Sequence, residues 1–185
     1  MQTVLDSNVD SHPVLIEFQE EECYGKPAQE LAAYFGWTVC AVYFGIAVYV
    51  AKNDLRARQF VPYIYESLLL IQHKDPRRFA RIKKYTRHIV LRECKYAASY
   101  SNRYKLSSIA PSYLDDEPRY RIFTLLWIAT ALIHEATHGR VHAGRVPHSK
   151  WRRNAIEDLC ELEERRFLRR IDRNIVKRFR PNEPL

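Results

Sequence analysis

The feature that most restricts the fold of this chain is an uncharged run of 21 residues, from Leu31 to Ala51. A helix needs about 20 apolar residues to cross the hydrocarbon layer of a membrane, so this run is long enough to span one. Trp37 lies toward one end and Tyr49 toward the other, as interfacial aromatic residues often do. We therefore expect a transmembrane helix over residues 31–51, with a buried core helix as the alternative.

The charges on either side of this run differ in sign. Residues 1–30 contain seven acidic residues and one lysine, whereas the whole chain carries a formal charge of +8. By the positive-inside rule, the chain after residue 51 would be cytoplasmic and the acidic end would lie outside. The sequence thus predicts an acidic tail over 1–30, a single-pass membrane helix over 31–51 and a basic helical domain over 52–185. A soluble cytoplasmic protein is the alternative.

Glycine is scarce, with 5 residues in 185, and apolar residues recur at helical spacing along much of the domain. We expect a mainly α fold with a small sheet, in the α+β class. Three longer helices are expected over 55–72, 119–139 and 154–179, the first with Pro62 in its first turn. A further short helix is expected to carry Phe79, Ile82 and Tyr85. The expected strands are His88–Arg92 and a second one near Leu106–Ala110.

The chemistry of the chain is concentrated in one motif, His134-Glu135-Ala136-Thr137-His138. Histidines four apart on a helix lie one turn apart on the same face, where both can bind one metal ion. Glu135 lies beside them and is placed to act as general base on a metal-activated water. The competing interpretation is that the histidines cap the end of a core helix and interact with its dipole.

A catalytic zinc site needs a third protein ligand and an open position for water. The candidates after the motif are His142, His148, Glu157 and Glu161, and Gly139 is expected to break the helix before His142. We favour Glu157 as the ligand, with Glu161 one turn later as a hydrogen-bond partner of a ligand histidine and His142 as an alternative ligand. In the alternative, these glutamates are solvated and pair with arginines such as Arg165.

The motif followed by a glutamate on a later helix resembles the gluzincin metallopeptidases, the thermolysin-like class, and minimal metallopeptidases built on two helices. The resemblance covers about residues 119–165. It implies a zinc-dependent peptidase with His134, His138 and Glu157 as ligands and Glu135 as base. Metzincins are excluded because they require glycine and histidine where this chain has Val141 and Gly144. No residue that would stabilise the transition state is identified, with Tyr113, His142 and His148 as open candidates.

Two other functions remain open from the sequence. One is a catalytically inactive, membrane-anchored protein that binds metal or a partner. The other is a nucleic-acid-binding protein, prompted by the arginines of residues 152–180, although no nucleic-acid fold signature accompanies them. The same basic helix is equally suited to lie on anionic lipid or to be an ordinary solvated face. The peptide or protein substrate is not indicated.

Overall fold

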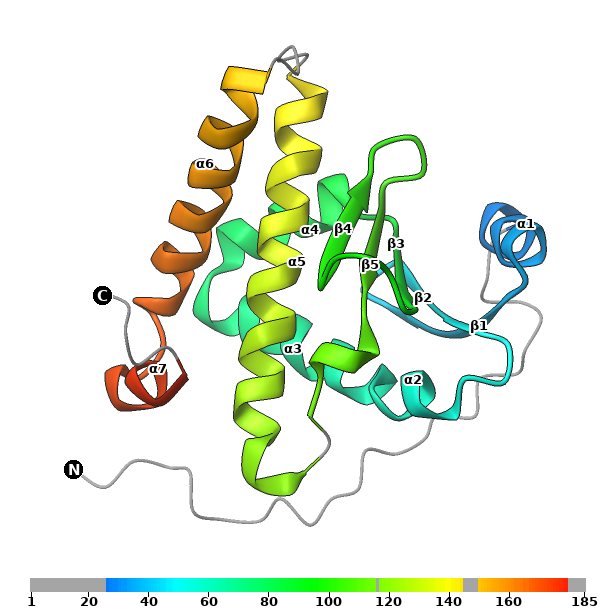
Figure 1. Ribbon diagram of the computed structural model, residues 1–185, viewed down its shortest axis with the longest axis horizontal. Coiled ribbons are helices and arrows are strands. Elements are labelled where there is room, and N and C mark those ends of the chain that lie inside the picture. The colour runs from blue at the N-terminus through cyan, green and yellow to red at the C-terminus, as the bar shows by residue number, and fades with distance from the viewer. Residues whose placement is uncertain (1–25, 116, 145–149, 180–185) are drawn as a thin grey trace.

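A mixed sheet lies beside a bundle of helices in the computed structural model, which describes residues 26–115, 117–144 and 150–179 (Figure 1). The strands are β1 (Trp37–Tyr43), β2 (Ile46–Ala51), β3 (His88–Leu91), β4 (Ala98–Ser101) and β5 (Leu106–Ile109). Their order is β1-β2-β3-β5-β4. The three inner strands run parallel, and β1 and β4 are antiparallel strands at the two edges.

Helices cover both faces of the sheet unequally. On one side of the sheet lie α2 (Leu55–Gln59), α3 (Val61–Lys74), α4 (Pro76–Tyr85), α5 (Arg121–Ala143), α6 (Lys150–Leu168) and α7 (Arg173–Phe179), which share one apolar core. Among the described helices, α1 (Lys26–Phe35) is the one that covers the other face, over a smaller cluster around Trp37 and Tyr49. Two short 3₁₀ helices, η1 (Pro111–Tyr113) and η2 (Pro118–Tyr120), precede α5. The predicted class, mainly helical with a small sheet, is confirmed.

The prediction of one continuous helix over Leu31–Ala51 is wrong. The run contains the end of α1 and then a hairpin of β1 and β2. Gly36 ends the helix with φ of 67°, and the turn at Phe44 and Gly45 has φ of 55° and 84°, which is the geometry that tight hairpins require. Strand β2 is apolar throughout because both its faces are covered, so an uncharged run does not imply a helix.

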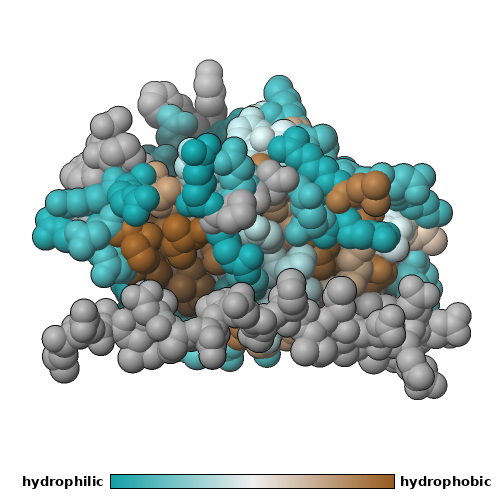
Figure 2. Space-filling view, turned by 90° about the horizontal axis from the view of Figure 1, so that it is seen from below, coloured by the Kyte–Doolittle hydropathy of each residue, from teal (hydrophilic) through white to brown (hydrophobic). Residues whose placement is uncertain are grey.

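Within the described ranges, no helix combines the length and the apolar character needed to cross a membrane. Seen from below, the molecule shows separate hydrophobic areas among hydrophilic groups (Figure 2). Most of the predicted acidic tail, residues 1–25, lies outside the described residues, and α1 begins at Lys26 within it.

Several shorter predictions are confirmed. Strands β3 and β5 occupy the two segments expected to be strands, and α4 buries Phe79 and Ile82 as expected.

The helix expected over 55–72 consists of two helices, α2 and α3, with Pro62 in the first turn of α3. The last helix is likewise divided, because α6 ends at Leu168 and α7 begins at Arg173.

Helix α5 does not end at Gly139 as expected but continues to Ala143, with Gly144 as its C-cap. Gly139 is buried, and a Cβ at this position would lie 2.7 Å from the Tyr100 Oη and 2.9 Å from the Tyr85 Cβ. The glycine therefore allows β4 to approach α5 closely and does not terminate the helix. This approach sets the sheet edge against the helix that carries the motif.

A network of buried charges fastens α6 to α4. Glu163 is 3% exposed, and its Oε2 lies 2.5 Å from Arg81 Nη1 and 3.1 Å from Arg78 Nη2. Its other oxygen accepts a hydrogen bond of 2.7 Å from Arg166. Arg78 also pairs with the buried Asp75 at the start of α4. These contacts fix where α6 lies against the rest of the molecule and so where its other glutamates point.

Glu163→Gln is expected to destabilise the fold by about 1–3 kcal/mol, because Arg81 loses its carboxylate partner while Arg78 keeps Asp75. Burial alone would raise the pKa of Glu163, but hydrogen bonds from Arg81 and Arg166 outweigh it and hold the pKa below its usual value. Its stabilising contribution is therefore present near neutral pH and is lost as the pH falls through that lowered pKa. Urea denaturation at neutral and acidic pH measures the effect.

Glu161→Gln, on the same helix, is the matched control. Its side chain is 58% exposed and its Oε2 lies 3.9 Å from Arg165, so the change should alter the free energy of unfolding by about 0.5 kcal/mol or less. Equal decreases in the free energy of unfolding for the two variants would show that the buried network does not hold α6 in place.

Candidate metal centre

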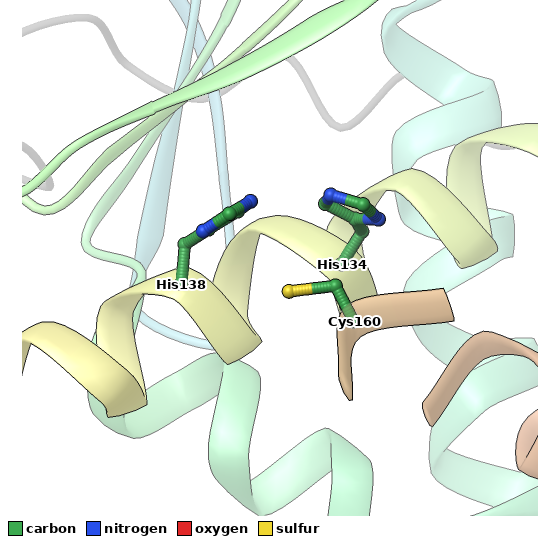
Figure 3. A group of neighbouring side chains, drawn as sticks. All are labelled: His134, His138 and Cys160. Atoms are coloured by element: carbon green, nitrogen blue, oxygen red, sulfur yellow. The ribbon is translucent and has the colours of Figure 1, made fainter. Parts of the chain in front are cut away.

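Helix α5 presents His134 and His138 one turn apart, as the motif predicts (Figure 3). The centroids of the two rings are 5.0 Å apart. Their side chains are 21% and 17% exposed, so water or a small ligand can reach them although most of their surface is covered. The helix is well formed here because its neighbours Ile133, Ala136 and Thr137 are buried against the core.

Glu157 reaches this pair from α6. Its Oε2 lies 3.2 Å from His134 Nε2 and 3.5 Å from His138 Nε2. Atoms that bind zinc at about 2.0–2.1 Å with tetrahedral angles are about 3.3 Å apart, so the oxygen of Glu157 has this spacing from each of the two nitrogens. The residue favoured from the sequence as third ligand is thus brought to the histidines by the packing of α6 on α5.

Glu164 also lies against His134, and sequence reasoning missed it. Its Oε1 is 2.6 Å from His134 Nδ1. A carboxylate only accepts hydrogen bonds, so Nδ1 carries a proton, and in the neutral ring the lone pair is then on Nε2. This is the orientation that a metal-binding imidazole needs, with a carboxylate fixing the tautomer. The signal in the sequence was the spacing of seven between Glu157 and Glu164, which places both on one face of α6.

The structure does not bring Glu161 to the histidines. This side chain is exposed and lies near Arg165, the solvated arrangement weighed as the alternative. His142 lies on α5 one turn beyond His138, and its ring stacks on Tyr100 with centroids 6.4 Å apart. Tyr113 is 56% exposed and stacks on Trp127. His148 lies outside the described residues.

Glu135 is 5% exposed and sits on the side of α5 that faces β4. Burial raises the pKa of Glu135 to about 7; the charges of Glu157 and Glu164 add to this, and His134 opposes it. Its charge also acts on Tyr100, contributing to a pKa of about 12 for that phenol, although burial is the larger cause. A nearby divalent cation would favour the ionised carboxylate, which is the form that accepts a proton.

The groups at this centre are of the types that bind zinc. Nε2 of His134 faces the carboxylate of Glu157, and the same oxygen faces Nε2 of His138. Burial alone would lower the pKa of His134, but its hydrogen bond to Glu164 and the neighbouring carboxylates raise it overall. Burial and the charge of His134 lower the pKa of His138. Protons on the two rings can satisfy both contacts, and a zinc ion held between these groups would satisfy them as well. The donor set therefore fits zinc.

Cys160 adds a fourth group of metal-binding type. Its Sγ and one ring nitrogen from each of His134 and His138 all lie within 4.8 Å of one another. Glu157 remains a candidate for third ligand because its oxygen lies 3.2 and 3.5 Å from the two Nε2 atoms. The sequence indicated no role for this cysteine in metal binding.

Glu164→Gln is expected to weaken zinc binding about 10- to 100-fold, because the ring of His134 loses the carboxylate that orients it. Competition titration with a chromophoric chelator measures the affinity. Glu161→Gln should bind zinc as the unaltered protein does. If instead Glu161→Gln weakened binding and Glu164→Gln did not, the assignment of the two glutamates would be reversed.

Comparisons of this chain with protein-family models, with curated proteins and with solved structures find no match.

Proposed function

We propose that this protein is a zinc-dependent metallopeptidase of the HExxH type. The observation that carries the proposal is the convergence of three atoms, the Nε2 atoms of His134 and His138 and the Oε2 of Glu157, at separations of 3.2 and 3.5 Å. Two histidines and a glutamate are a common ligand set of catalytic zinc sites. The buried carboxylate of Glu135 beside them is the further group that hydrolysis requires.

His134, His138 and Glu157 would hold the ion, and Glu164 would keep the ring of His134 in place. When bound, zinc supplies a Lewis acid that polarises a substrate carbonyl and lowers the pKa of water toward about 7. Glu135 takes the proton of the attacking water and returns it to the leaving amine, so that one carboxylate acts as base and then as acid. Its burial excludes bulk water from this transfer.

The position of β4 supports a peptide as substrate. This strand is at the edge of the sheet and contacts α5, because Tyr100 packs on Gly139. In the described part of the chain, β5 is the only strand that pairs with β4, which leaves the outer edge of β4 for an extended peptide. A peptide that adds as a strand to a sheet edge is bound through its backbone, so many sequences can bind.

Two measurements on the purified full-length chain test the proposal. Elemental analysis should give one zinc ion per chain, and a mixture of unstructured peptides should be cleaved at rates that fall when zinc is removed and recover when it is restored. Mass spectrometry identifies the cleaved bonds. A chain that binds no stoichiometric zinc would exclude this function.

A metal centre without hydrolytic activity is the second candidate. The buried Cys160 favours it, because sites closed by four protein ligands are typical of structural zinc. Zinc bound at one ion per chain, with no peptide cleaved by the protein or by a variant lacking this thiol, would support the second candidate over the first.

A further inference from the structure

The thiol of Cys160 is placed as a ligand would be placed. Cys160 follows Glu157 by three residues on α6, so both side chains leave the helix on neighbouring positions of one face. The residue is 0% exposed, and its sulfur points toward the gap between the two imidazole rings (Figure 3). Sγ and a ring nitrogen from each histidine lie within 4.8 Å of one another.

The surroundings of the sulfur differ from those of an ordinary core cysteine. Carbon side chains cover one side of it, where Val141 and Ile156 complete a small apolar cluster. The other side is occupied by the metal-binding nitrogens, with the carboxylates of Glu135 and Glu157 close enough to act on its ionisation. Among the described residues, none forms a hydrogen bond with this thiol. The sulfur is therefore buried, without a partner, and directed at the centre.

We propose that Cys160 is a fourth protein ligand of the ion held by His134, His138 and Glu157. This inference rests on the proposed zinc centre. As the metal binds, the S–H bond breaks, a sulfur–metal bond forms and the proton passes to solvent. Thiolate is a preferred zinc ligand, with a bond of about 2.3 Å, and two histidines, one glutamate and one cysteine would supply the four ligands of a tetrahedral zinc site.

A fourth protein ligand has a consequence for the proposed activity. It occupies the position that water needs, so the resting centre is closed and hydrolysis requires the sulfur to leave the metal. Cys160→Ala removes the ligand without adding bulk, and its expected effect on the loaded protein is faster peptide cleavage together with weaker metal retention. The sulfur would then act on the same centre as an inhibitory ligand.

Cobalt substitution tests the ligand directly and independently of activity. The full-length apoprotein is loaded with Co²⁺, and the absorption spectrum reports the ligand set. We expect visible bands of a four-coordinate ion and, in the near ultraviolet, a sulfur-to-cobalt charge-transfer band. Cys160→Ser should lose the charge-transfer band. Cys40→Ser is the matched control: its thiol lies on β1 and donates to the carbonyl of Thr38, so the band should persist.

The possible outcomes separate this inference from the proposed function. One Co²⁺ bound without a charge-transfer band would overturn the role of Cys160 and leave the histidine–glutamate centre intact. No stoichiometric Co²⁺ would overturn both. If Cys160→Ser does not fold, X-ray absorption of the unaltered zinc protein decides, because one sulfur at about 2.3 Å supports the inference and a shell of nitrogen and oxygen alone contradicts it.

Discussion

Glu135→Gln is expected to bind one zinc ion per chain and to lose about 10²- to 10⁴-fold in turnover. Glutamine has nearly the same shape as glutamate, so the buried position beside the metal ligands remains filled. Its amide cannot take a proton from water, and this removes the base but none of the ligands. Steady-state cleavage of a peptide found in the mixture screen measures turnover, and elemental analysis of the same preparation measures zinc.

The control for this variant is Glu161→Gln, which changes a carboxylate of the same type at an exposed position on α6. It should retain both zinc and turnover. Zinc retained by Glu135→Gln with unaltered turnover would show that another group serves as base. Zinc lost together with turnover would mean that Glu135 supports the metal directly, and the assignment of roles within the motif would need to change.

The sequence was informative where a residue pattern has one structural solution. Histidines four apart lie on one face of any helix, so the pairing of His134 and His138 followed from spacing alone. Strand β3 is short and β-branched between charged residues, and it was located correctly. The mainly helical class followed from the scarcity of glycine and from the repeating apolar positions.

The sequence was misleading where two structures share one pattern. An uncharged run is compatible with a membrane helix and also with a hairpin that is covered on both faces. Only Gly36 and the Phe44-Gly45 pair, as turn residues, distinguished them. Gly139 was expected to end α5, although glycine also serves where another backbone or ring must approach closely. The sequence does not tell which of these two uses applies, because the partner at Tyr100 is distant along the chain.

The candidate site was predictable in part for a similar reason. Glu157 could be selected because a third ligand was required and a later helix supplied glutamates. The choice between Glu161 and Glu164 as partner of His134 depended on the rotation of α6, which the buried Glu163 network sets. Cys160 was overlooked because it occupies the apolar stripe of the same helix, where a cysteine is read as a small hydrophobic residue.

His138→Ala is expected to abolish stoichiometric zinc binding. In the proposed centre the ion is shared between α5 and α6, so a chain with one imidazole and the glutamate retains too few ligands to compete with water. In the unaltered protein, zinc at 1,000 times its dissociation constant should stabilise the fold by about 4 kcal/mol, which raises the thermal midpoint. The variant should unfold at the same temperature with and without added zinc, as differential scanning calorimetry can record.

His142→Ala provides the matched control because it removes an imidazole one turn further along the same helix. Its ring stacks on Tyr100, so the variant should keep one zinc ion and its zinc-dependent rise in thermal midpoint. If His142→Ala lost zinc while His138→Ala retained it, the ion would lie nearer the C-terminal end of α5. Glu157 could then no longer be a ligand of the ion. The carboxylate of Glu157 lies against Nε2 of His138 and of His134, which is one turn earlier on the helix.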